Sequence, residues 1–303
     1  MIFEFFVGHL VKAIEVTAKG INFHLDHQWQ VTPELAMNLM MEDTLEKGLD
    51  ISQCAKLYTV GVDGAGLAVV ADSLGALEAR VEAEKILSWD EVYENLENNF
   101  EGVKGERIRL MLNSSPKHCG GNTVSDKWAK RLTEVWVEKI KAQPMPDNRQ
   151  LIPSWFSWSR TIKYGSVVGA TPNGRKNGEP ISHGANPNPH FRVDGAVTAQ
   201  SSGISSVQCG YGNTAPLQLE FDPQLAPDKN GVEIITKLIL DHFKEGGTLI
   251  NINILDSDKL MAANENPDLY PDLVVRVAGF TAYFAGLSPE FRQLVVNRFL
   301  KGM

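Results

Sequence analysis

Apolar residues recur along this chain at two spacings, one typical of helices and one typical of strands. The opening segment, residues 1–16, has apolar side chains at helical spacing, which predicts an amphipathic core helix that begins abruptly at the N-terminus. Further helices are predicted over 33–48, where Gly48 suits the C-cap, over the Ala-rich residues 63–85 and over 124–140. SWDE (88–91) is a capping box that begins another helix, and KLYTVGV (56–62) is typical of a strand.

The second half of the chain changes character at residues 162–195, which are dense in Gly, Pro, Asn and Ser. This segment predicts a long ordered loop or a domain seam. After it we expect a helix ending at Gly246, a strand with one buried face over TLININIL (248–255), a short helix, a strand over LVVRVA (273–278) and a last helix beginning at Ser288–Pro289. The alternation of strands and helices indicates an α/β architecture.

Composition narrows the class of protein. The chain has 303 residues, 43% hydrophobic and 22% charged, as is usual for a globular protein, and its net charge of −8 argues against a nucleic-acid partner. No apolar run is long enough to span a bilayer, and the apolar start lacks the basic region and cleavage site of a signal peptide. The three widely spaced cysteines form no C-x-x-C motif and suit a reducing compartment. We therefore expect a cytoplasmic protein without a membrane partner.

Two short motifs could bind a ligand, but each has a plainer explanation. GVDGAGLA (61–68) follows a strand and precedes a helix, as a phosphate-binding loop does, yet its glycines are not spaced G-x-G-x-x-G, so close packing of small residues is favoured. His24 and His27 could ligate a metal, but no third ligand stands out, and a solvated face is favoured. Glu42 and Asp43 are interpreted as surface charges. No metal site is predicted.

The remaining candidates are nucleophiles and one cation. Cys54, Cys119 and Cys209 could each be a nucleophile, but no spacing joins any of them to a base, and each is interpreted as a small buried apolar residue. In ATPNGRKNGEP (170–180), Arg175 could contact an anionic substrate, whereas Pro-Asn-Gly favours a turn that orders the loop.

A bare glycine, Gly279, lies between an apolar run and an aromatic run in RVAGFTAYF (276–284). On local sequence alone, a buried bulge glycine would explain it. The stretch nevertheless resembles the Arg-Val-x-Gly-Tyr radical motif of the glycyl radical enzymes, the superfamily of pyruvate formate-lyase, diol dehydratases and aryl-acetate decarboxylases, with Phe280 where tyrosine is usual. Three further blocks resemble the same family in order, namely GAGLAVVADSLGAL (64–77), ATPNGRKNGEPISHGANP (170–187) and LSPEFRQLVVNR (287–298).

The resemblance implies a fold, a site and a mechanism. It implies the C-terminal part of a ten-stranded β/α barrel, with an incomplete barrel portion over 1–170 and a glycine radical domain over 171–303 that carries the radical loop and a terminal helix. Gly279 would store the radical in a buried loop, supported by Arg276, Val277 and Phe280, which would also be recognised by an activase. The loop is expected to be buried by its apolar flanks, Val274, Val275, Val277, Phe280, Tyr283 and Phe284.

The resemblance also implies partners. A radical S-adenosylmethionine enzyme with an iron–sulfur cluster would install the radical, and this chain has no cysteine cluster to hold such a cofactor itself. The family's cysteine motifs, Gly-Cys-x-Glu or Cys-Cys, do not occur here, so the chain is expected to be incomplete, inactive alone and prone to expose apolar surface. An N-terminal half or a full-length homologue would supply the cysteine, and the complete enzyme would be a homodimer.

Several alternatives remain open at this point. The reaction could be of the formate acetyltransferase, dehydratase or decarboxylase type: GFTAYF (279–284) favours the last two, and GANP (184–187) the first. The chain could instead be a non-catalytic accessory or split subunit that supplies its glycyl loop to another chain. An unrelated α/β binding domain would require all four blocks to be coincidence.

Overall fold

The computed structural model describes residues 1–303 except 156–159, 189–196, 209–214, 226–229, 278 and 303. The chain forms two compact units. The first comprises Met1–Val62 and Glu134–Pro153, and the second comprises Asp63–Thr133 and Ser154–Met303. The expected division into domains at residues 170 and 171 stays a prediction.

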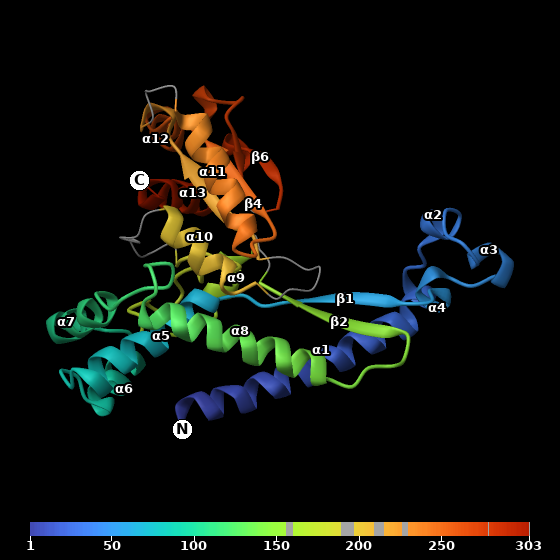
Figure 1. The fold of residues 1–303 in the computed structure, drawn as a ribbon, viewed down its shortest axis with the longest axis horizontal. Helices are drawn as coiled ribbons and strands as arrows, with labels where there is room; N and C mark the ends of the chain where they lie inside the picture. Colours follow the sequence, from blue (N-terminus) through green and yellow to red (C-terminus); the bar gives the residue numbers. More distant parts are fainter. Residues whose placement is uncertain (156–159, 189–196, 209–214, 226–229, 278, 303) are drawn as a thin grey trace. The chain divides into compact units, whose positions relative to one another are not determined.

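The first unit consists of helices beside a pair of strands. Helix α1 (Ile2–Val31) is followed by three short helices, α2 (Leu35–Asn38), α3 (Thr44–Lys47) and α4 (Ile51–Cys54). Strand β1 (Tyr58–Asp63) pairs with β2 (Arg149–Ser154), as Figure 1 shows. The second half of α8 (Val124–Ala142) also belongs here. Arg149 connects β2 to α1 by an ion pair with Asp26 at 2.5 Å.

Two expectations for this unit need correction. The opening segment is helical, but it is not a core helix. Among residues 1–16 only Ile14 is buried, and Phe5 is 66% exposed, because the described residues cover little of α1. Residues 33–48 form two short helices, since Asp43 adopts a left-handed φ of 71°, which an α-helix does not continue through. Gly48 does end α3 with a left-handed φ of 61°, as predicted for a C-cap.

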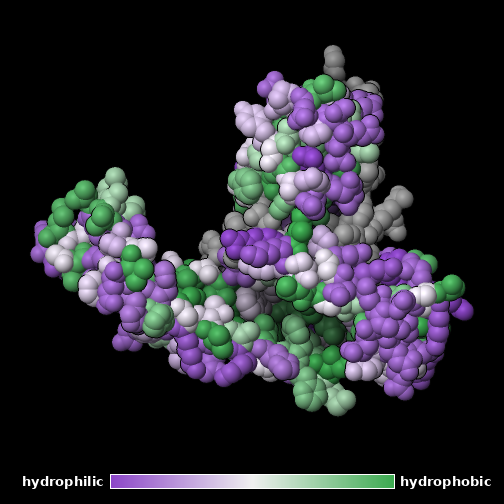
Figure 2. All heavy atoms as spheres, turned by 180° about the vertical axis from the view of Figure 1, so that it is seen from behind, coloured by the Kyte–Doolittle hydropathy of each residue, from purple (hydrophilic) through white to green (hydrophobic). Residues whose placement is uncertain are grey.

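Large apolar side chains are exposed on the first unit. They gather on the lobe that carries α2 and α3, at the left of Figure 2. The exposed large apolar residues of this lobe are Leu35, Met37, Leu39, Met40, Met41, Leu45 and Leu49. A patch of this kind is typical of a surface that meets another protein surface.

The second unit begins with a helical layer. Helix α5 (Leu67–Leu77) continues into a π-helical turn (Glu78–Ala83) and is followed by α6 (Trp89–Glu97), α7 (Gly102–Asn113) and the first half of α8. The predicted capping box is confirmed, because Ser88 and Glu91 bond reciprocally at the start of α6. Apolar residues of α5, α6, α7 and the segments that connect them form one core, which comprises Ala76, Leu77, Val81, Leu87, Val92, Phe100, Ile108 and Leu112.

A loop was predicted over 162–195, but residues 162–165 belong to the short helix α9 (Thr161–Gly165), so the predicted start of the loop is wrong. Residues 166–188 contain no helix or strand beyond an isolated bridge between Thr171 and Arg175, so the prediction is confirmed for this part. Residues 189–195 lie outside the described residues.

The C-terminal part of this unit carries the region of interest. Helix α10 (Val197–Ser205) precedes β3 (Leu217–Phe221). Strand β3 pairs in parallel with β4 (Ile250–Ile254), and α11 (Gly231–Lys244) lies between the two strands in the sequence. Helix α12 (Ser257–Glu265) leads to an antiparallel hairpin of β5 (Val274–Arg276) and β6 (Thr281–Tyr283), and α13 (Pro289–Gly302) ends the chain. Among the residues described here, 3-10 turns lie between these elements at Pro223–Leu225, Pro267–Leu269 and Phe284–Gly286.

Beneath the hairpin lies a second apolar core. It is made by α12, α13 and one face of the hairpin (Figure 1) and comprises Leu255, Leu260, Ala263, Leu273, Val275, Val277, Phe284, Val295, Val296 and Phe299. Burial of this many apolar side chains fixes α13 against the hairpin.

Candidate active site around Gly279

Gly279 lies in the tip of the β5–β6 hairpin. Arg276 pairs with Thr281 as the last strand pair, and the Val277 N–H donates to the carbonyl of Phe280 at 3.0 Å, next to Gly279. Both Gly279 and Phe280 are exposed. The hairpin therefore brings the four predicted site residues, Arg276, Val277, Gly279 and Phe280, together in one turn.

The expectation of a buried loop is wrong for the described chain. Alternate side chains of a hairpin point to opposite faces. On one face Val275, Val277 and Phe284 are buried in the core, with Val275 only 1% exposed. On the other face Val274 and its cross-strand partner Tyr283 are exposed, at 42% and 61%, and Phe280, in the turn, is 48% exposed. The described residues therefore cover only one face of the radical-motif hairpin.

A polar cluster holds the strand that enters the turn. The Arg276 N–H donates to Asn253 Oδ1 at 2.7 Å, and Asn253 Nδ2 donates to the Arg276 carbonyl at 3.0 Å. From α13, Arg298 donates to the carbonyls of Arg276 and Val277, each at 2.8 Å. Strand β4 and helix α13 thus both bind the backbone of the chain just before Gly279.

Arg298 is itself held by a buried carboxylate. Its Nε lies 2.5 Å from Glu220 Oε1, and the Glu220 side chain is only 2% exposed. Burial raises the pKa of Glu220, while the Arg298 charge and the bonds from Asn253 and Gln218 oppose that rise. Because the ion pair is largely shielded from water, removal of one partner would leave the other as an uncompensated buried charge.

Arg276 points its guanidinium across the hairpin. It donates to Thr281 Oγ1 at 3.2 Å and to Asn251 Oδ1 of β4 at 3.4 Å. The side chain therefore connects both hairpin strands to β4, which suits a supporting role for the turn.

Glu220, Asn253 and Arg298 were not identified as site residues from the sequence. Strand β4 has one buried face, as its alternation predicts, but the more deeply buried residues are the asparagines, Asn251 and Asn253. Asparagine is disfavoured in strands, so its recurrence at alternate positions in ININI was the available signal. In the sequence analysis Arg298 was noted only as the last residue of the stretch LSPEFRQLVVNR (287–298).

The other sequence candidates have structural roles. Arg175 is fully buried and donates to the carbonyls of Val168, Gly169 and Lys176 at 2.9, 2.9 and 2.6 Å, and Gly174 N–H donates to Thr171, so the interpretation as an ordered turn is confirmed. A β-carbon on Gly64 would overlap the Trp155 ring, which confirms close packing for GVDGAGLA.

The histidine, carboxylate and cysteine candidates are also accounted for. His24 and His27 are exposed, and among the described residues no group of three or more His, Cys, Asp or Glu side chains is arranged to hold a metal. Glu42 is exposed and Asp43 pairs with Lys47 at 2.8 Å. Cys119 is fully buried, which raises its pKa, and Cys54 is half-buried. Cys209 lies outside the described residues.

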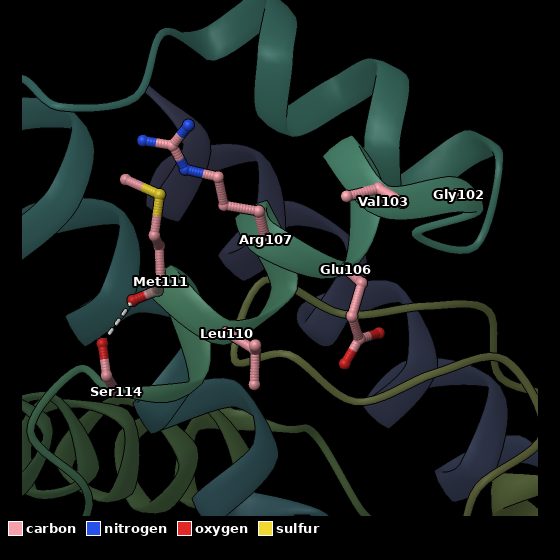
Figure 3. A pocket seen from close by; sticks show the side chains of 7 residues that line it. All are labelled: Gly102, Val103, Glu106, Arg107, Leu110, Met111 and Ser114. Atoms are coloured by element: carbon pink, nitrogen blue, oxygen red, sulfur yellow. Dashed lines mark hydrogen bonds between the residues drawn. The ribbon is translucent and has the colours of Figure 1, made fainter.

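One groove follows a single helix. It has a volume of about 800 Å³ and is lined only by α7, from Gly102 and Val103 to Met111 and Ser114 (Figure 3). Its lining contains no residue of the Gly279 hairpin, so it is no part of the candidate site.

Comparison with known proteins gives a consistent result. Residues 2–165 match the family described as Pyruvate formate lyase-like, and residues 181–285 match the family described as Glycine radical. The chain is 27% identical to trans-4-hydroxy-L-proline dehydratase of Clostridioides difficile over 263 residues, which cover 86% of this chain and 33% of that protein. It is 30% identical to isethionate sulfite-lyase of Oleidesulfovibrio alaskensis over 235 residues, 77% and 28% of the two chains.

A solved structure agrees. The crystal structure of a glycyl radical enzyme from Archaeoglobus fulgidus matches with a TM-score of 0.86 and 28% identity, over 95% of this chain and 37% of that one. The chain therefore belongs to the glycyl radical enzyme superfamily, a family of enzymes. The predicted fold class is confirmed, since the solved structures that the chain resembles are glycyl radical enzymes with the ten-stranded barrel fold.

Two further observations concern the length of the chain and its helices. The chain spans about a third of the length of the curated relatives that it matches, since it covers 33% of the hydroxyproline dehydratase. In the part of the chain that the structure describes, every helix is too short or too polar to cross a membrane.

Proposed function

We propose that this chain stores a radical on the α-carbon of Gly279 and passes it to a cysteine thiol for radical cleavage of a C–C or C–X bond. The observation that carries the proposal is the position of Gly279, which lies in an exposed hairpin turn whose entering strand is held by a buried polar cluster. The match of residues 181–285 to the Glycine radical family, which includes position 279, supports it.

Glycine suits this chemistry because it has no side chain. Its α-carbon can become planar after loss of one hydrogen atom, and the unpaired electron can then spread over the adjoining amide and carbonyl. In the transfer step, the thiol gives a hydrogen atom to the Gly279 α-carbon, which restores its C–H bond and leaves a thiyl radical. The thiyl radical then takes a hydrogen atom from the substrate.

Installation of the radical is assigned to a partner. A radical S-adenosylmethionine activase, which holds the iron–sulfur cluster, would remove the hydrogen atom from Gly279, and the exposed Phe280 beside it would be available for recognition. Arg276 and Val277 would support the turn from within the hairpin.

The open face of the hairpin favours a second form of the same proposal. Val274, Phe280 and Tyr283 leave an apolar surface beside Gly279 that another chain or another part of the protein could cover. The chain would then act as a subunit that supplies its glycyl loop to a cysteine-bearing barrel. This arrangement would bury the radical, as protection from dioxygen requires.

Cleavage by air tests the proposal. A backbone radical reacts with dioxygen and breaks the chain where it resides, so anaerobic activation followed by air exposure should cut the chain at residue 279. Mass spectrometry should detect the C-terminal peptide in the wild type and in Gly286→Ala, a nearby exposed glycine with open space around it. Gly279→Ala should remain intact. Cleavage of Gly279→Ala at the same place would contradict the proposal.

A further inference from the structure

The hairpin that carries Gly279 is joined to the parallel strands through side chains. The β5–β6 pair and the β3–β4 pair are separate sheets. Where they meet, the carboxamide of Asn253 accepts from the Arg276 N–H at 2.7 Å and donates to the Arg276 carbonyl at 3.0 Å. The Asn253 side chain therefore links β4 to β5 with one accepted and one donated hydrogen bond, as backbone groups link neighbouring strands within a sheet.

Arg298 completes this attachment from α13. Its two terminal nitrogens donate to the carbonyls of Arg276 and Val277, each at 2.8 Å, and its Nε pairs with buried Glu220 at 2.5 Å. We call Glu220, Asn253 and Arg298 the hairpin clamp. The planar fork of the guanidinium fixes both direction and distance, which a lysine ammonium does not.

We propose that Arg298 and Asn253 are positioning residues that orient the Gly279 loop for hydrogen-atom transfer, with Glu220 holding Arg298 in place. The inference rests on the proposed function. Transfer between two atoms requires near contact, and a displacement of about 1 Å can reduce a rate on the order of 100-fold. The clamp ends at Val277, two residues before Gly279, so it acts through the backbone.

Hydrogen–deuterium exchange of the full chain tests the clamp without activation. Arg298→Lys keeps the positive charge opposite Glu220 and loses the fork. Arg292→Lys is the matched control, because Arg292 lies on the same helix and donates to the carbonyl of Leu287 at 2.8 Å, outside the hairpin. Exchange of the amides in 275–283 should rise about tenfold in Arg298→Lys and stay within about twofold of wild type in Arg292→Lys.

A second variant keeps the test decisive if Arg298→Lys unfolds. Asn253→Ala removes the other half of the clamp and keeps the Glu220–Arg298 ion pair, and it should give the same local rise in exchange. If the amides in 275–283 of a folded Arg298→Lys or Asn253→Ala variant exchange no faster than those of Arg292→Lys, the clamp is overturned.

The activated protein tests the positioning role itself. Arg298→Lys should still form the organic radical, but its paramagnetic resonance splitting from the remaining α-hydrogen should broaden, because the peptide geometry around Gly279, which sets the spin density on the α-carbon, is no longer uniform. Arg292→Lys should give the wild-type line shape. An unchanged line shape in Arg298→Lys would overturn the positioning role alone. Absence of any glycyl signal from activated wild type would overturn the proposed function and the positioning role, and would leave the clamp, read by exchange, intact.

Discussion

Gly64 lies directly beneath the indole of Trp155, so close that a β-carbon at position 64 would overlap the ring. The ring is also held at its edge, since Trp155 Nε1 donates to Thr133 Oγ1 of α8 at 2.9 Å. Gly64, within a stretch that looks like a phosphate loop, is therefore explained by the packing of one aromatic ring, whereas Gly66 has a left-handed φ of 83°. The glycine is required because the ring is buried and has no room to move.

We predict that Gly64→Ala destabilises the second unit by about 1–3 kcal/mol, the usual cost of forcing extra volume into a packed core. Urea unfolding followed by tryptophan fluorescence measures the change. Gly169→Ala is the control, because nothing lies within 4 Å of its added β-carbon, and it should change stability by about 0.5 kcal/mol or less. Equal stability of the two variants would show that Trp155 does not constrain position 64.

Arg175 offers a second test, because its buried guanidinium bonds to carbonyls of its own loop. Arg175→Lys supplies one nitrogen centre in place of the fork and leaves carbonyls unbonded, so we expect a loss of about 2–4 kcal/mol and faster proteolysis within residues 166–180. Arg107→Lys, at an exposed position on α7, should have neither effect. If Arg175→Lys cleaves no faster than wild type, the side chain does not order the loop.

Asp72 gives a prediction about pH. It is buried in α5 and accepts from the His118 N–H at 2.7 Å, and burial raises its pKa to about 6 although the Lys117 charge opposes the rise. Between the unfolded pKa of about 4 and the folded value, the folded state binds the proton and the unfolded state does not. The contribution of Asp72 to the free energy of unfolding therefore falls as pH rises through this window.

Asp72→Asn should remove that dependence. Its amide oxygen can still accept from His118, and it never becomes charged. Relative to wild type, the variant should gain stability from pH 4 to pH 6, by up to about 3 kcal/mol. Urea unfolding at several pH values measures the difference. A constant difference between variant and wild type across this range would contradict a raised pKa at Asp72.

The elements with strong local signals were predictable from the sequence. The capping box at Ser88 and Glu91, the C-cap at Gly48 and the start of α13 follow from backbone chemistry within a few residues. The radical-motif hairpin was found as a strand and a bare glycine, since β-branched residues precede Gly279.

The parts that were missed depend on contacts between distant residues. Asn253 and Arg298 meet at Arg276 only after β4, β5 and α13 have assembled, and no local pattern records that meeting. The burial of the loop was overestimated because apolar flanks alone do not show what covers them. Val275 meets α12 and α13 in the core, whereas Tyr283 on the opposite face and Phe280 in the turn remain exposed.

The most direct measurement of the central claim is the electron paramagnetic resonance spectrum of the anaerobically activated protein. Wild type should give an organic radical signal whose α-hydrogen splitting collapses when the protein is grown with glycine deuterated at the α-carbon. Gly286→Ala should give the same signal, and Gly279→Ala should give none. An undiminished signal in Gly279→Ala would contradict the assignment of the radical to Gly279.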